Sequence, residues 1–283
     1  MKHYDALTVH ADRETLELVM ALGGNLPITG MLDEEESVSL YFDEGVLSDE
    51  MIGEFQEQLG ERGEEARFER GEIEEQNWNL EFEQSLEPVR VAEGLIFTQS
   101  WNHVEPREGD LVVTIDPKMS FGTGHHESTR LISRLMMGVD LQGKSVMDIG
   151  TGTGALAIIA AKRGASRILA FDNNEWAVEN TVENVRLNDV AEGIEIVQGE
   201  LEEMERQLFD LTLANLHRNL IIRLLPDIVS RMNRPDGLLM TSGVLIEDYQ
   251  GLVDAAREHG LQPCVEEREN EWIATTFGFV ASE

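Results

Sequence analysis

The chain contains a single cysteine, Cys264. One thiol excludes a disulfide within the chain and any zinc site that needs two cysteines from it, and it suits a reducing cytoplasm. The longest apolar run, Ala155 to Ala161, is far shorter than the ~18 residues that a membrane-spanning helix needs. The N-terminal sequence MKHYDALTVH also has no apolar stretch like that of a secretory signal. We therefore expect a cytoplasmic protein without a membrane segment.

Positive charge is scarce in this sequence. The chain has 22 basic and 55 acidic residues, a formal net charge of -33, and only four lysines. Because no basic stripe is present, we do not expect direct binding to nucleic acid phosphates. The acidity fits either a surface adapted to high salt or attraction to a basic partner. Salt adaptation is favoured because a partner site should be local, whereas the acidic runs are spread over residues 33–36, 61–75, 192–205 and 266–271.

The length of 283 residues favours two domains over one compact core. Residues 1–75 alternate short strands and helices, and Asp12 and Ser48 stand where the two helices begin. The expected elements are strands at 4–9, 27–32, 38–42 and 66–69 and helices at 12–22 and 48–59. This βαββαβ order predicts a small ferredoxin-like α+β domain.

Residues 76–100 are expected to connect this domain to a second one. The charged and aromatic stretch from Glu72 to about Val91 places Trp78 and Phe82 at helical spacing, which predicts a connecting helix.

From residue 101 to 283, continuous apolar strands alternate with helices. This pattern predicts a doubly wound, mainly parallel sheet covered on both faces, a Rossmann-like α/β domain. The expected strands are 111–116, 144–150, 167–172, 194–199, 209–215, 237–243 and 272–277, and the expected helices are 129–137, 156–163, 176–187, 220–232 and 249–259.

A glycine-rich turn follows the strand that ends in Asp148. Its sequence is DIGTGTG, and the glycines are Gly150, Gly152 and Gly154. Glycines suit such a turn because bulky Cβ atoms would keep a ligand away from the backbone. The next strand ends in Asp172, whose carboxylate can accept hydrogen bonds from both ribose hydroxyls of an adenosine-bearing cofactor.

Nicotinamide cofactors use the same geometry, so the turn alone leaves the cofactor open. S-adenosylmethionine is favoured for three reasons: the turn lies in mid-chain and carries a third glycine, a second glycine-rich loop precedes it, and a later strand ends in Asn215.

The second loop is IDPKMSFGTGHHEST, residues 115–129. It could fold over a cofactor, and Ser128 or Thr129 could cap the helix that follows. We expect no metal site at His125 and His126, because adjacent histidines rarely chelate one ion together and no H-x-x-x-H spacing occurs.

A third block, FDLTLANLHRNL, ends a buried strand in Asn215. The side-chain oxygen of Asn215 can accept an N–H from an incoming amine. The backbone carbonyl of Leu216 is a second candidate for orienting that amine. Alternatively, Asn215 caps the next helix, and His217 is a surface histidine.

Together, these blocks resemble the bacterial ribosomal protein methyltransferase family PrmA, which modifies large-subunit ribosomal protein eleven (L-eleven). The resemblance covers most of the chain and is carried by the segment QNWNLEF…EPVRVAEGLIFTQSW (76–101), the 115–129 loop, DIGTGTGALAIIAAKRGA, FDNN, LANL and GLLMTSGVL. It implies that the cofactor positions are Thr129, Gly150, Asp172 and Asn215, with Phe121 and Gly122 beside them.

This chain departs from the family at Asn173 and Asn174, where an acidic residue and a proline are more usual. The N-terminal domain matches the family in length and element order rather than in residues. In the family that domain recognises the substrate.

The resemblance implies an S-adenosylmethionine-dependent transfer of methyl groups to lysine or N-terminal amines of L-eleven, by an enzyme expected to be a monomer. Alternatives are a methyltransferase of another protein or a small molecule, a nicotinamide-dependent oxidoreductase, and a regulator that binds the cofactor without turnover. A glutamine methyltransferase should carry Asn-Pro-Pro-Tyr where this chain has Asn-Leu-His-Arg, at 215–218.

Overall fold

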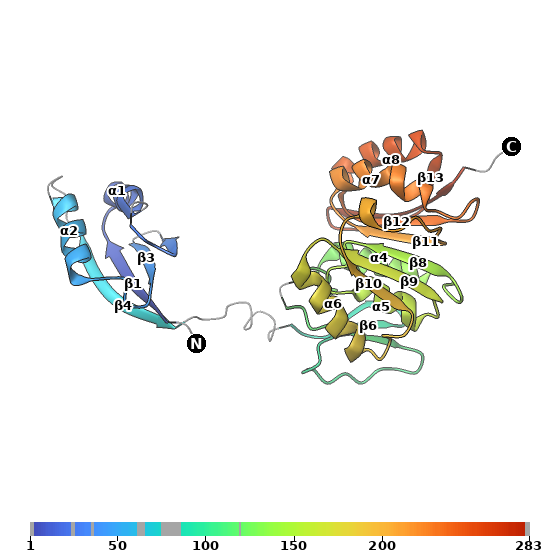
Figure 1. The fold of residues 1–283 in the computed structure, drawn as a ribbon, viewed down its shortest axis with the longest axis horizontal. Coiled ribbons are helices and arrows are strands. Elements are labelled where there is room, and N and C mark those ends of the chain that lie inside the picture. Colours follow the sequence, from blue (N-terminus) through green and yellow to red (C-terminus); the bar gives the residue numbers. More distant parts are fainter. Residues whose placement is uncertain are drawn as a thin grey trace. The chain divides into compact units, whose positions relative to one another are not determined.

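A computed structural model gives the fold of the chain (Figure 1). It describes residues 3–23, 26–34, 37–60, 66–74, 86–118 and 120–280. The chain divides into two compact units, Met1–Trp78 and Asn79–Glu283.

The first unit is a four-stranded antiparallel sheet with two helices. Its elements are β1 (His3–His10), α1 (Arg13–Gly23), β2 (Gly30–Asp33), β3 (Ser37–Asp43), α2 (Asp49–Gly60) and β4 (Arg67–Glu74). The strand order β2-β3-β1-β4 is the ferredoxin-like order that the sequence predicts. Both helices begin where the sequence indicates, because Asp12 Oδ1 accepts the Thr15 N–H (2.9 Å) and Ser48 Oγ accepts the Met51 N–H (3.1 Å).

The core of this unit lies between the sheet and the two helices. Alternate residues of β1 and β3, among them Leu7 and Leu40, are fully buried together with Leu16 of α1 and Phe55 of α2. Because side chains of a strand alternate between faces, one face of the sheet receives both helices.

The second unit is built on a seven-stranded sheet of order β10-β9-β8-β11-β12-β14-β13. The strands from β10 to β12 run parallel, and β14 pairs antiparallel with β12 and β13. Their bounds are β8 Ser145–Ile149, β9 Arg167–Asp172, β10 Ile194–Gln198, β11 Leu211–Asn215, β12 Leu238–Leu245, β13 Leu261–Glu269 and β14 Trp272–Phe279. This is the doubly wound, mainly parallel sheet predicted from the sequence.

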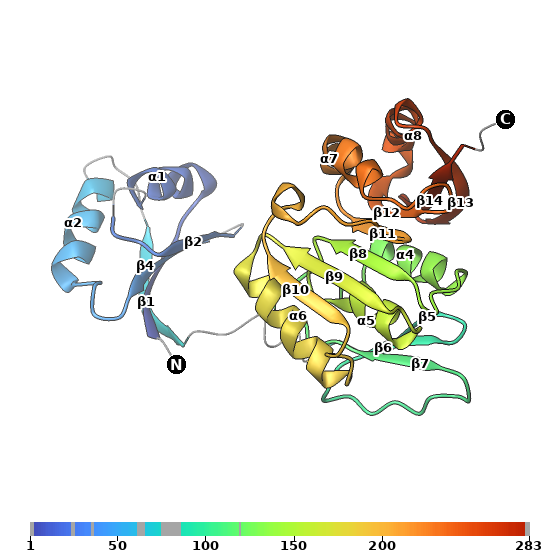
Figure 2. The ribbon, with the colours of Figure 1, turned by 45° about the vertical axis from the view of Figure 1, so that its right-hand side comes forward.

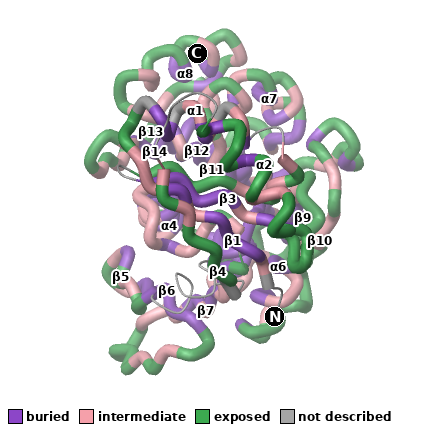
Figure 3. The backbone as a smooth tube through the Cα atoms, turned by 90° about the vertical axis from the view of Figure 1, so that its left-hand side faces the viewer, coloured by how far each residue is buried: buried purple, intermediate pink, exposed green. Residues whose placement is uncertain are grey.

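Helices cover both faces of this sheet. They are α4 (Glu127–Met137), α5 (Ala155–Lys162), α6 (Glu175–Leu187), α7 (Arg218–Ser230) and α8 (Tyr249–Glu258), with 3-10 turns η1 (Leu201–Glu203) and η2 (Ile246–Asp248). The core cluster on one face contains α4, α5 and α6, and the cluster on the other contains α7 and α8 (Figure 2). In β8, Val146 belongs to the first cluster and Met147 to the second. Buried residues, coloured purple in Figure 3, lie both in the strands and on the helix faces that pack against them.

A three-stranded sheet of order β5-β6-β7 packs beside α4 and α5, and it corrects two of our predictions. Its strands are β5 (Val89–Ala92), β6 (Leu95–Thr98) and β7 (Leu111–Thr114). The prediction of a helix over 72–91 is wrong at both ends, because residues 72–74 belong to β4 and residues 89–91 to β5. The middle of the predicted helix, residues 75–85, lies outside the described residues. Residues 111–116, predicted as a strand of the large sheet, supply β7 instead. These residues join the small sheet because β7 pairs in parallel with β6, and the local sequence pattern of a strand does not reveal its pairing partner.

The sequence pattern also missed β13. Its residues include the acidic run from Glu266, which is typical of a solvated surface, and most of the strand is exposed at the sheet edge. Charged side chains on an exposed edge strand discourage pairing with other chains. Within the described residues, no helix combines the length and the apolar character needed to cross a membrane.

Candidate active site

A cleft of about 900 Å³ opens at the carboxyl ends of the parallel strands. Chain order reverses between β8 and β11, since β9 and β10 lie to one side and β12 to the other. Open α/β sheets bind ligands at such a switch point. The lining includes Lys118, Ser120, Phe121, His126, Gly150, Gly152, Asp172, Asn173, Asn174, Trp176, Glu200, Asn215, Leu216, His217, Arg223, Gly243 and Trp272.

The predicted site residues fall into two groups. Phe121, Gly150, Gly152, Asp172, Asn215 and Leu216 line the cleft. The others, Gly122, Thr129, Asp148 and Gly154, are not part of its lining. Thr129 accepts a hydrogen bond from Asn215, which lines the cleft, whereas the other three contact Thr153, Thr151 and Thr181 beneath it.

The glycine turn after β8 has no room for side chains. Gly150, Gly152 and Gly154 all have positive φ angles, of 68°, 57° and 81°. A Cβ on Gly150 would lie 2.7 Å from Leu216 Cδ2, and one on Gly152 would lie 2.3 Å from the Phe121 carbonyl oxygen. Gly154 is the N-cap of α5, where a Cβ would meet Thr181. Glycine is therefore required for close packing as well as for the backbone conformation.

Asp172 ends β9 beside this turn and faces the cleft. Its Oδ2 accepts the Gly152 N–H (3.1 Å), and its Oδ1 accepts the Asn174 N–H (3.0 Å). These bonds fix the carboxylate while each oxygen keeps a further lone pair for a ligand. Asn174, one of the two departures from the family noted in the sequence, caps α6 because its side-chain oxygen accepts the Trp176 N–H.

Asp148 supports the turn from below. Its side chain is 1% exposed, and its Oδ2 accepts the Thr151 hydroxyl (2.7 Å). Burial raises the pKa of Asp148 to about 7, the hydrogen bonds from Thr151 and the Ala157 backbone oppose the rise, and the nearby Asp172 charge adds to it. The carboxyl group is therefore largely protonated in the folded state below neutral pH.

The second glycine-rich loop lies directly on the first. Thr153 donates its N–H to the Phe121 carbonyl and its hydroxyl to the Gly122 carbonyl, both at 2.9 Å. Gly122 has a φ of 111°, and a Cβ there would lie 2.7 Å from Thr153 Oγ1. Phe121 is thereby held at the cleft with about half of its side chain exposed.

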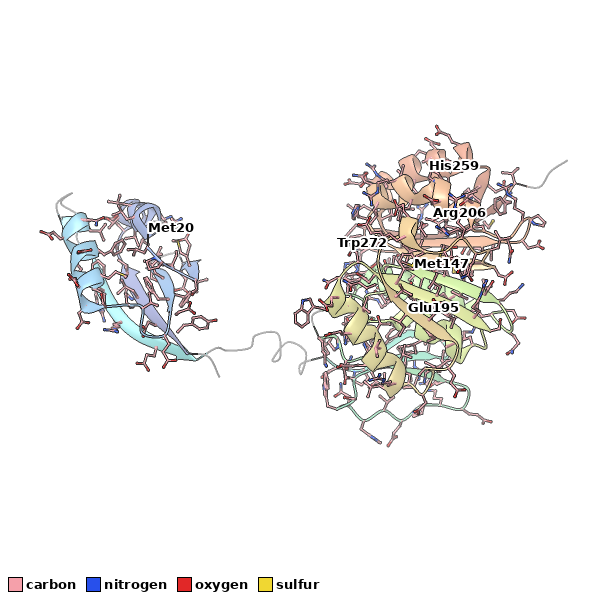
Figure 4. The ribbon with its side chains drawn as sticks, in the orientation of Figure 1. Met20, Met147, Glu195, Arg206, His259 and Trp272 are labelled. Atoms are coloured by element: carbon pink, nitrogen blue, oxygen red, sulfur yellow. The ribbon has the colours of Figure 1, made fainter. Side chains whose placement is uncertain are left out.

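Three aromatic rings form one wall of the cleft, and sequence reasoning missed two of them. The His126 ring lies 5.2 Å from that of Phe121 and 4.8 Å from that of Trp272, the first residue of β14, which Figure 4 labels. His126, rather than Ser128 or Thr129, is the N-cap of α4, and its Nδ1 accepts the Ser128 N–H (3.1 Å). This bond leaves the proton of a neutral imidazole on Nε2.

Asn215 ends β11 at the cleft, with one side-chain atom unpaired. Its Nδ2 donates to Thr129 Oγ1 at 3.4 Å, whereas its buried Oδ1 has no hydrogen-bond partner among the described residues. An unpaired buried acceptor is costly, so it suggests a missing ligand donor. The alternative interpretation of Asn215 as a helix cap is wrong, because His217 is the N-cap of α7.

Gly243 was not among the predicted site residues, although it lies in the GLLMTSGVL block that carries the family resemblance. It has a φ of 79° and lines the cleft. A Cβ there would lie 2.7 Å from the Leu216 carbonyl oxygen and 3.3 Å from Asn215 Oδ1. A side chain at this position would therefore crowd both acceptors.

A solved structure of similar fold indicates the class of protein to which the chain belongs. The crystal structure of a ribosomal protein L11 methylase from Lactobacillus delbrueckii subsp. bulgaricus is similar, with a TM-score of 0.65 and 26% identity, and the match covers 69% of this chain and 99% of that one. With the sheet order and the cleft at its switch point, this likeness defines a Rossmann-like α/β methyltransferase that depends on S-adenosylmethionine.

The family follows from the sequence comparisons. The family model for ribosomal protein L11 methyltransferase (PrmA) matches residues 2–278. A ribosomal protein L11 methyltransferase of Chlorobaculum tepidum is 37% identical over 274 residues, covering 95% of this chain and 94% of the relative. One from Bacteroides fragilis is 30% identical, covering 98% and 99%. The chain belongs to the ribosomal protein L11 methyltransferase (PrmA) family.

Proposed function

We propose that the chain transfers methyl groups from S-adenosylmethionine to lysine side chains, the N-terminal amine, or both, of ribosomal protein L11. The observation that carries this proposal is the unpaired Asn215 Oδ1, which lies with the Leu216 carbonyl beside Gly243 in the cleft that the two glycine-rich loops border. Two acceptors side by side suit a nucleophile that presents N–H donors, as an amine does.

The residues present fit the cofactor. Asp172 would accept hydrogen bonds from the ribose hydroxyls, and Gly150 and Gly152 would allow close approach to the backbone. Phe121 would cover it, Gly122, Asp148 and Gly154 would support the two loops, and Thr129 would hold Asn215. When bound, the cofactor supplies a sulfonium methyl group as the electrophile.

The site must also hold the substrate amine in its neutral form. A lysine amine with a pKa of about 10.4 is neutral in only about one molecule in a thousand near pH 7.4, a cost of roughly 4 kcal/mol. The wall of Phe121, His126 and Trp272 can disfavour the ammonium form by excluding water. Asn215 Oδ1 and the Leu216 carbonyl then orient the amine, and orientation itself lowers the barrier.

We assign substrate recognition to the ferredoxin-like domain, residues 1–75, and catalysis to residues 101–283. The enzyme is proposed to be a cytoplasmic monomer without direct contact to nucleic acid. Its acidic surface is proposed to be an adaptation to high salt, which the spread of acidic residues along the chain supports. Recognition of L11 would then depend on short-range packing, because salt screens long-range attraction.

The test is methyl transfer from labelled S-adenosylmethionine to purified L11. Asn215→Ala should lower kcat more than it weakens cofactor binding, because Asn215 contacts the nucleophile. Asn219→Ala, an exposed asparagine on α7 outside the cleft, is the matched control and should change neither. Equal losses of rate and affinity in Asn215→Ala would limit the residue to cofactor binding. Methylation of small amines but not of L11 would favour a different substrate.

A further inference from the structure

Three asparagines lie one helical turn apart along α6 and its C-cap, and neither the motifs nor the cleft account for them. Asn180, Asn184 and Asn188 are at most 6% exposed. Residues four apart lie on the same face of a helix. Burying three amides on one face costs free energy unless their donors and acceptors find partners.

Their partners are backbone groups of the segment that leaves β7. Asn188 Oδ1 accepts the Thr114 N–H (2.9 Å), and its Nδ2 donates to the Thr114 carbonyl (2.6 Å). Asn184 does the same with Asp116, accepting its N–H (2.9 Å) and donating to its carbonyl (3.2 Å). Asn180 Nδ2 also donates to the Asp116 carbonyl (2.8 Å). The amides of Asn184 and Asn188 thus each pair like the peptide of a neighbouring strand.

Asn184 makes one further bond that Asn188 does not. Its Nδ2 also donates to the carbonyl of Thr153 (2.9 Å), in the glycine turn after β8. Thr153 in turn donates its N–H to Phe121 and its hydroxyl to Gly122. Hydrogen bonds therefore link Asp116 through Asn184 and Thr153 to Phe121 and Gly122, and all three of Asp116, Phe121 and Gly122 belong to the second loop, residues 115–129.

We propose that Asn184 is a positioning residue that sets the spacing of the two glycine-rich loops and thereby the affinity for the cofactor. This inference rests on the proposed cofactor site. Asn184 is not part of the cleft lining, so its effect passes through Asp116 and Thr153. Asn188 hydrogen-bonds the backbone at the end of β7 in the same manner but makes no hydrogen bond to the glycine turn.

The experiment compares Asn184→Ala with Asn188→Ala in the full chain. Both remove a buried amide and several hydrogen bonds, so both should lower the melting temperature by similar amounts. Calorimetry with S-adenosylmethionine should show Kd raised at least about tenfold in Asn184→Ala and less than about threefold in Asn188→Ala. The KM for the cofactor should follow Kd, while kcat at saturating cofactor stays within about twofold of the wild type.

Thr153→Val provides a second break in the same set of hydrogen bonds. It removes the hydroxyl bond to Gly122 with little change in volume, so it tests the proposal even if Asn184→Ala does not fold. It too should raise Kd for the cofactor.

Unchanged Kd in Asn184→Ala, or equal increases in the two asparagine variants, would overturn the proposal, as would unchanged Kd in Thr153→Val. If the wild type itself does not bind S-adenosylmethionine, the proposed function fails and this inference fails with it. That result is distinct from a wild type that binds and a variant that binds equally well.

Discussion

Replacing Asp148 by asparagine should stabilise the second unit more as the pH rises. The pKa of Asp148 is raised from 3.8 to about 7 in the folded chain, mainly by burial. A raised carboxyl pKa means that the folded state prefers the protonated group. The stability from this preference is complete below pH 3.8 and is lost as the pH rises through about 7.

The size of the effect follows from the shift. About 3 pKa units at roughly 1.4 kcal/mol each correspond to about 4 kcal/mol, of which about 3 kcal/mol is lost between pH 5 and pH 8. The asparagine side chain of the Asp148→Asn variant is neutral at every pH and can still accept the Thr151 hydroxyl. The free energy of unfolding of this variant relative to wild type should therefore rise by about 3 kcal/mol over that range.

The assay is urea unfolding without cofactor at several pH values, followed by tryptophan fluorescence. A Trp78→Phe background leaves Trp101, Trp176 and Trp272, which all belong to the second unit. General repulsion among the acidic residues changes with pH in both proteins and cancels in the difference.

Asp236→Asn, which removes one exposed carboxylate, is the matched control and should show a difference that is flat with pH. The reasoning is refuted if the difference for Asp148→Asn is equally flat, because Asp148 would then be ionised in the folded state throughout.

Three further predictions concern the cofactor, the domains and salt. Asp172→Ala should weaken S-adenosylmethionine binding by about 1.5–3 kcal/mol, the range for charged hydrogen bonds, and calorimetry showing unchanged affinity would count against its role. A chain starting near Gln76 should fold and bind the cofactor yet lose activity on L11, and full activity would remove the recognition role of residues 1–75. The melting temperature should climb with potassium chloride from ~0.1 M to molar concentrations, because the screening length falls from about 10 Å to about 3 Å. Sodium sulfate at matched ionic strength separates screening from salting-out, and a flat or falling melting temperature would favour a partner-binding surface instead.

The sequence by itself determined the element order of the first unit, the alternation of strands and helices from β8 to β12 in the second, and the strand ends that carry Asp148, Asp172 and Asn215. These features are local: apolar runs, turn glycines and capping residues act within a few positions of one another. A parallel sheet then brings the strand ends to one edge, so the position of the cleft follows from the pattern.

Only the tertiary structure decided which motif residues line that cleft and which support it. Asp148 precedes Gly150 by two positions, yet it is buried beneath the turn while Gly150 lines the cleft, and no spacing rule separates the two outcomes. Trp272 lies against His126, 146 positions away in the sequence, and the backbone of Gly243 lies so close to the Leu216 carbonyl that a side chain there would clash with it. The pairing of β6 with β7 and the exposed edge strand β13 were missed for the same reason. Contacts between distant segments depend on how the elements pack, and the sequence around a residue does not indicate which distant residue it will contact.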